Sequence, residues 1–136
     1  MIRAAMMLAA SRRSTATPPE PDPFFSQVKL LVHADTNFAD SSSMARAVTN
    51  VGAVGIDAGA RFGAGAASFT TAGQRLDYAA TDAAMNLPAG DFTIELWMKP
   101  VAFSGSGVRT VVSRNVFENG WNLEIGQSGT IFFTVV

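Results

Sequence analysis

The clearest alternation of apolar and polar residues in the chain lies in the segment GDFTIELWMKP, residues 90–100. Even positions from 92 to 98 are apolar, and the odd positions between them carry Thr, Glu and Trp. Side chains alternate between the two faces of a strand, whereas a helix would spread these residues around its axis. Turn residues at 87–91 precede the segment, and Pro100 would end its ladder. We therefore predict a long central strand with one buried face, formed by Phe92, Ile94, Leu96 and Met98.

Shorter β-prone segments, separated by turn residues, follow one another through most of the chain. They predict strands at residues 28–33, 47–50, 67–70, 74–78, 108–114, 121–125 and 130–136. Residues 81–87 are compatible with a single helical turn, and no longer helix is indicated within the domain. About eight short strands broken by turns are typical of an all-β, antiparallel sandwich or jelly roll.

Several segments resemble laminin-G-like domains, which have a concanavalin A-like jelly-roll fold. The matching pieces occur in that family's order: VKLLVHAD (28–35), FADSSS (38–43), RFGAGAASF (61–69), LDY (76–78), GDFTIELW (90–97) and GWNLEI (120–125). The resemblance implies an all-β jelly-roll domain over residues 24–136. Complete members of the family continue through several further strands. We therefore expect an incomplete sandwich, whose remaining strands come from a continuation of the chain or from another chain, and we favour the first portion of a longer protein.

Composition narrows the possible functions. The 136 residues are 48% hydrophobic and 15% charged, as expected for one globular domain with a single core. A net charge of −1 provides no basic field for nucleic acid, and no apolar run reaches the roughly 18 residues of a membrane span. The chain has no cysteine and a single histidine, His33, so thiolate sites, His-cluster metal sites and His-based relays are excluded within one chain.

Residues 1–23 differ in composition from the rest of the chain. An Ala/Met/Leu-rich stretch, residues 1–10, is followed by residues 14–23, which hold four of the six prolines and should form a stiff extended spacer. A signal peptide is one alternative, but its apolar middle would be short and two arginines follow where small residues are expected. A disordered tail is another. We interpret the segment as an arm that docks on a partner chain through Met1, Ile2, Met6, Met7, Leu8, Arg12 and Arg13.

Two candidate binding sites follow from residue chemistry. Asp35, Asn37 and Asp40 lie in one loop and carry the oxygen ligands that calcium prefers. Laminin-G-like domains often hold calcium, so calcium is the one cofactor we consider; the alternative is that these side chains bond to the loop's own backbone. Trp97 falls on the polar face of its predicted strand and is a candidate glycan contact, with structural packing beneath a loop or the arm as its alternative. Trp121 alternates with Leu123 and Ile125 and is predicted to be core.

Glycoside hydrolase activity is a further possibility, because glucanases share the jelly-roll architecture. It requires two carboxylates about 5 to 9.5 Å apart. Asp91 and Glu95 would share one strand face but lie roughly 13 Å apart at about 3.3 Å per residue. We therefore predict no catalytic residues.

Taken together, these features predict a non-enzymatic structural or adhesion module of a larger assembly. An opening segment such as DPFFSQVKLL, residues 22–31, resembles those of domains in bacteriophage virion proteins, including tail fibres and capsid decoration proteins. The predicted location is the virion, and the predicted partners are other protein chains, including further copies of this one. The alternative is a secreted or cell-surface carbohydrate-binding domain, with or without calcium.

Overall fold

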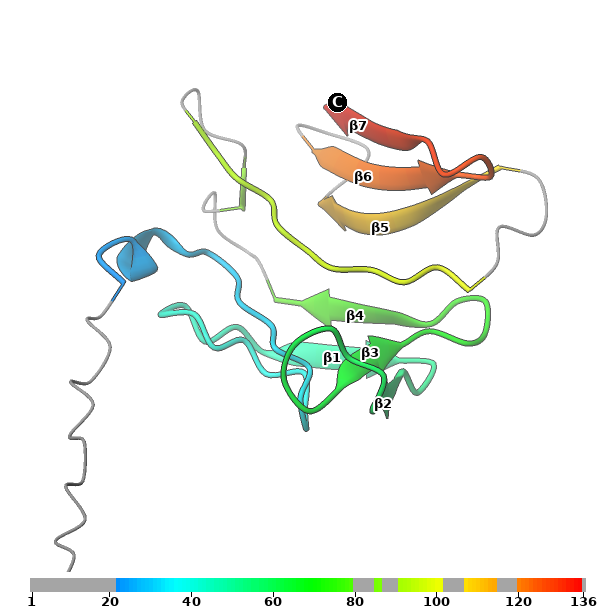
Figure 1. Cartoon of the computed structure of the whole chain (residues 1–136). Coiled ribbons are helices and arrows are strands. Elements are labelled where there is room, and N and C mark those ends of the chain that lie inside the picture. Colours follow the sequence, from blue (N-terminus) through cyan, green and yellow to red (C-terminus); the bar gives the residue numbers. More distant parts are fainter. Residues whose placement is uncertain (1–21, 80–84, 87–90, 102–106, 115–119, 136) are drawn as a thin grey trace, which may run out of the picture.

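The computed structural model describes residues 22–79, 85–86, 91–101, 107–114 and 120–135. Regular structure within these residues consists of short strands and one turn of 3₁₀ helix (Figure 1). The described part of the chain is therefore all-β, as predicted. The elements are η1 (Phe25–Gln27), β1 (Val48–Val51), β2 (Gly55–Asp57), β3 (Ala66–Ser68), β4 (Arg75–Tyr78), β5 (Val108–Arg114), β6 (Trp121–Gly126) and β7 (Ile131–Val135).

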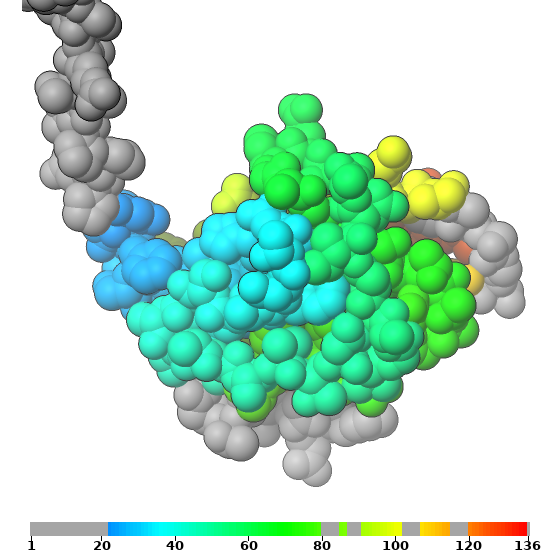
Figure 2. Space-filling model, turned by 90° about the horizontal axis from the view of Figure 1, so that it is seen from below, coloured from blue at the N-terminus to red at the C-terminus, as the bar shows by residue number. Residues whose placement is uncertain are grey.

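The described strands form three antiparallel sheets. β1 pairs with β4, β2 pairs with β3, and β5, β6 and β7 form a three-stranded sheet in that order. The three-stranded sheet lies on one side of the molecule and the two small ribbons on the other (Figure 1). Seen from below, residues 22–79 form most of the surface (Figure 2). The N-terminal ribbons and loops thus form one half of the molecule, and the β5–β7 sheet forms the other.

The β6–β7 hairpin follows directly from its sequence. Gly129 has a φ of 80°, and the turn is closed by hydrogen bonds from Gly129 N–H to Gly126 O (3.0 Å) and from Gly126 N–H to Thr130 O (2.7 Å). A type I turn followed by a left-handed glycine is a common three-residue hairpin loop. The resulting register places Leu123 opposite Phe133. The strands predicted at 108–114, 121–125 and 130–136 are all confirmed, with small differences at their ends.

β5 contains an irregularity that the sequence pattern did not predict. Its pairing with β6 shifts between Thr110 and Val112, so that Val111 is an extra residue on the β5 side. Val111 and Val112 are both half-buried, which breaks the strict alternation along the strand. A bulge of this kind bends its strand and increases the local twist.

In the N-terminal half, polar side chains close the turns between very short strands. The Asn50 side chain accepts from Val54 N–H (2.8 Å) and donates to Val54 O (3.0 Å). Gln74 donates to the carbonyls of Gly52 and Ala53, both at 3.0 Å. Two-stranded ribbons are marginal in water, so these bonds supply order that the ladders are too short to provide.

Two strand predictions in this half need correction. Residues 28–33 form no strand: the only pairing found there among the described residues is an isolated bridge from Val32 to Asp40, and His33 is exposed. β2 is a strand that the sequence pattern did not predict. The strands predicted at 47–50, 67–70 and 74–78 correspond to β1, β3 and β4. No predicted end differs from the observed one by more than two residues. The helical turn predicted at 81–87 lies mostly outside the described residues.

The predicted central strand, residues 92–98, is also wrong as a strand. The segment runs extended between β4 and β5 (Figure 1), but residues 91–100 carry no ladder. Its expected core face is half-buried at best, with Phe92 48%, Leu96 36% and Met98 39% exposed. Alternation specifies which side chains share a face, but a ladder also needs a partner whose N–H and C=O groups are available and in register.

Burial in the described residues is sparse. The buried apolar side chains are Ala34, Val54, Trp121 and Ile125. Trp121 was predicted to be core and is 5% exposed; its indole N–H donates to Met85 O at 3.1 Å. This bond ties β6 to the chain between the two halves, so Trp121 joins apolar burial to a specific polar contact.

We predict that Trp121→Phe lowers the free energy of unfolding by about 1 to 2 kcal/mol, because it removes a hydrogen bond and part of the buried ring. Urea denaturation monitored by circular dichroism measures the change. The same substitution at the exposed Trp97 should cost less than about 0.5 kcal/mol. Equal losses at the two positions would contradict the placement of Trp121 in the core.

Candidate functional site

Asp40 is a buried carboxylate that fastens the loop before β1. Its Oδ1 accepts from Leu31 N–H (3.0 Å) and Ser42 N–H (2.9 Å), and its Oδ2 accepts from Arg46 N–H (3.0 Å). The Arg46 side chain in turn donates to the carbonyls of Lys29 (3.2 Å) and Ala79 (3.1 Å). The side chains of Asp40 and Arg46 together therefore connect residues 29–46 to the residue that follows β4.

This environment changes two pKa values. Burial raises the pKa of Asp40, but backbone N–H donors from Arg46, Leu31 and Ser42, with the Ser42 hydroxyl, outweigh it and hold the pKa at about 2. Tyr78, whose hydroxyl donates to Phe38 O at 2.9 Å, has its pKa raised by burial and by the negative charge of Asp40. Asp40 is thus charged and saturated with donors at neutral pH.

Asp35 and Asn37 have similar local partners. Asp35 Oδ1 accepts from Ala64 N–H at 2.7 Å and, more weakly, from Gly65 N–H at 3.4 Å. Asn37 Oδ1 accepts from Ala39 N–H at 2.9 Å. The amides of Ala64 and Gly65, in the glycine-rich loop before β3, therefore face a carboxylate of the same chain.

The three residues considered as calcium ligands thus all direct an oxygen at backbone amides, the bonding stated above as the alternative. Among the described residues, no group of three or more His, Cys, Asp or Glu side chains could hold a metal ion. The geometry supports a loop-fastening role for Asp35, Asn37 and Asp40, and calcium binding stays a hypothesis.

Trp97 belongs to an exposed group of three side chains, which we call the Arg61 cluster: Arg61, Phe62 and Trp97. The rings of Phe62 and Trp97 meet edge to face, with centroids 5.2 Å apart at 76°. The Arg61 guanidinium carbon lies 5.5 Å from the Phe62 centroid and 5.4 Å from the Trp97 centroid. Phe62 is 62% exposed and Trp97 69%. The cluster joins the loop before β3 to the extended segment 91–101.

Sequence reasoning placed Trp97 on an outer face but missed Arg61 and Phe62. The glycine-rich segment that contains them, residues 61–69, was used only as part of the resemblance to laminin-G-like domains. The adjacent Arg-Phe pair at the start of that segment was the available signal. Its distance of about 35 residues from Trp97 in the sequence concealed the contact.

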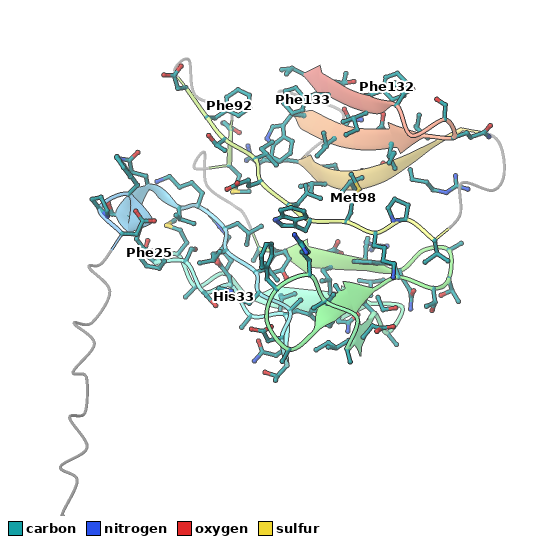
Figure 3. The ribbon with its side chains drawn as sticks, in the orientation of Figure 1. Phe25, His33, Phe92, Met98, Phe132 and Phe133 are labelled. Carbon is teal, nitrogen blue, oxygen red and sulfur yellow. The ribbon has the colours of Figure 1, made fainter. Side chains whose placement is uncertain are left out.

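The sheet formed by β5, β6 and β7 is a second exposed surface. Phe133 lies between Phe92 (centroids 5.9 Å apart) and Trp121 (6.2 Å), and it points toward Phe92, whereas Phe132 points away on the other face (Figure 3). Every residue of β7 is nevertheless exposed. Among the described residues β7 pairs with β6 alone, so its outer edge is open.

The arm residues Met1, Ile2, Met6, Met7, Leu8, Arg12 and Arg13 lie outside the described residues. In the part of the chain that is described, no helix is long and apolar enough to cross a membrane.

Comparison with known proteins gives no relative: no protein family, curated protein or solved structure matches the chain.

We predict that the stability conferred by Asp40 depends on pH. Its pKa in the folded protein, about 2, lies below the ordinary 3.8. The contribution, about 2 kcal/mol, is therefore present above pH 3.8 and is lost as the pH falls through 2. Asp40→Asn should cost about 1 to 3 kcal/mol at pH 7, because an amide nitrogen cannot accept from Arg46 N–H, and should flatten the stability profile between pH 4 and 2.

Urea denaturation from pH 7 to pH 2 measures both effects. Asp57→Asn is the matched control, because Asp57 is exposed and accepts one backbone bond, from Gly59 N–H. If the stability of Asp40→Asn changed with pH in parallel with that of the original protein, the loop-fastening role of the Asp40 carboxylate would be contradicted.

Proposed function

We propose that this chain is a non-enzymatic structural and adhesion module that works within a larger protein assembly. The observation that carries the proposal is the open edge of β7. The strand has the sequence IFFTV, carries no charge and is exposed throughout. Natural edge strands are normally protected by charge, proline, bulges or a covering segment. An unprotected apolar edge is suited to pairing with another chain.

The register of the hairpin indicates which groups are available at this edge. Gly126 and Thr130 form a hydrogen-bonded pair, and such pairs alternate with non-hydrogen-bonded ones along an antiparallel ladder. The N–H groups of Ile131, Phe133 and Val135 therefore point away from β6. The carbonyl groups of a strand from a second copy, paired with β7, would accept hydrogen bonds from these N–H groups. The added strand would also cover the apolar side chains beside them.

The finer architecture belongs to the same proposal. We propose that the three sheets are parts of the laminin-G-like jelly roll that the sequence resembles. Residues 91–101 run between β4 and β5, where a connecting strand of a sandwich would lie (Figure 1). The resemblance of residues 22–31 to bacteriophage virion domains favours a virion protein, such as a tail fibre or a capsid decoration protein, anchored by residues 1–23.

A carbohydrate-binding domain is the second candidate. The exposed Arg61 cluster favours it, since a sugar could stack on Trp97. The two functions are compatible in one chain because the cluster and the β7 edge share no residue.

We predict that the protein self-associates and that Val135→Pro weakens association at least tenfold, or about 1.4 kcal/mol. Proline removes one outward donor but leaves the β6–β7 ladder intact. Sedimentation velocity over a concentration series measures the change. Val101→Pro is the matched control, because Val101 is 96% exposed and lies outside every strand.

A protein that stays monomeric at all concentrations would contradict pairing of copies at β7. So would a Val135→Pro variant that associates as strongly as the original chain.

We also predict that deleting residues 1–21 abolishes incorporation into the native particle and leaves the domain folded. This deletion keeps Asp22, whose carboxylate accepts from Phe24 N–H at 2.8 Å. Circular dichroism reports the fold, and copies per purified particle report incorporation. Normal incorporation of the truncated chain would refute the anchoring role of the arm.

A further inference from the structure

We infer that the Arg61 cluster is a binding site for an acidic saccharide, in which a pyranose ring stacks on Trp97 and its carboxylate pairs with Arg61. This inference rests on the adhesion part of the proposed function and names its ligand class.

The arrangement of the cluster is the first observation. Its side chains come from two segments that the fold brings together, and one guanidinium contacts both rings at about equal distances, 5.5 and 5.4 Å. Guanidinium groups stack favourably on aromatic faces. Arg61 is therefore held in a limited range of orientations before any ligand arrives, which reduces the entropy lost on binding.

Exposure is the second observation. A tryptophan whose role is only to fill a core would be covered, as Trp121 is at 5% exposure, whereas Trp97 is 69% exposed although it contacts two side chains. Trp97 and Phe62 thus leave aromatic surface open beside a positive charge.

The charge of Arg61 is the third observation. Among the described residues, its guanidinium forms no hydrogen bond or ion pair, and the Asp35 carboxylate is directed at Ala64 and Gly65 N–H instead. A guanidinium presents several N–H donors in one plane, an arrangement that matches the two oxygens of a carboxylate. The cluster is therefore complementary to a negative group.

These features together select the ligand. The face of an aromatic ring is negative, so it attracts the weakly positive C–H groups on the face of a pyranose. A neutral sugar would leave the guanidinium unused, whereas a uronic-acid residue supplies both the C–H face and the carboxylate. A single arginine on a chain of net charge −1 is a poor match for the many phosphates of a nucleic acid.

The test uses the full chain and two oligosaccharides of equal length, hexagalacturonate and the neutral galactose hexamer. Tryptophan fluorescence and isothermal titration calorimetry measure binding. We expect hexagalacturonate to bind at least tenfold more tightly than the neutral hexamer. Arg61→Gln should remove that preference, and Trp97→Ala should weaken binding of hexagalacturonate at least tenfold.

Arg75→Gln is the matched control. Arg75 is an exposed arginine on β4 that pairs with Asp77 at 3.0 Å and lies outside the cluster. The Arg75→Gln variant should bind hexagalacturonate as tightly as the original chain does. Circular dichroism of each variant reports whether the fold is retained, and Phe62→Leu adds a milder change inside the cluster, which should also weaken binding.

Three results would overturn the inference: no saturable binding of hexagalacturonate, equal binding of the acidic and neutral hexamers, or undiminished binding by Arg61→Gln. Equally tight binding of a hexaglutamate peptide would overturn the saccharide part and indicate a protein partner. Val135→Pro leaves the cluster unchanged, so titrating this variant separates failure of the site from failure of assembly through β7.

Discussion

The N-terminal half of this protein depends on hydrogen bonds from side chains to the backbone. Asp40 is the main example: two carboxylate oxygens accept from three amides that belong to residues up to 15 positions apart. Asn50 and Gln74 act in the same way at the turns around β1 and β4. A buried carboxylate with three donors is well compensated for its burial, and each donor would be costly to leave unpaired. The path of the chain through this half is therefore fixed by a few polar side chains as well as by apolar contacts.

The C-terminal half follows a different logic. Its order comes from adjacent strands joined by a short hairpin turn, and from Trp121, which combines ring burial with the bond to Met85 O. The hairpin contacts are close in sequence, so the cost of closing their loop is small, whereas the bond from Trp121 to Met85 joins residues 36 positions apart. The aromatic contacts of Phe133 with Phe92 and Trp121 then connect the sheet to the extended segment beside it.

This difference explains what the sequence could predict. The β5–β7 sheet and its glycine turn were predictable because they depend on neighbours in the sequence. The burial of Trp121 was predictable from its alternation with Leu123 and Ile125. Residues 92–98 were misassigned because alternation gives the direction of side chains but not a ladder partner. Bonding of Asp40 to backbone amides was one of the two alternatives considered, but its donors Leu31 and Arg46 lie outside the loop and have no sequence pattern that identifies them. For the candidate site, the exposure of Trp97 was predictable, whereas its contact with Arg61 and Phe62 depends on tertiary structure.

The bulge in β5 has a consequence for how many chains such an assembly can join. At the β5 edge of the three-stranded sheet, the bulge distorts the strand and residues 91–101 run beside it (Figure 1). Among the described residues, the β7 side has neither form of protection. A sheet that can be extended at one edge only would be complete after a single two-fold pairing, since each copy would use its one open edge on the other. Self-association through β7 would then stop at a closed dimer and would not propagate into a fibre.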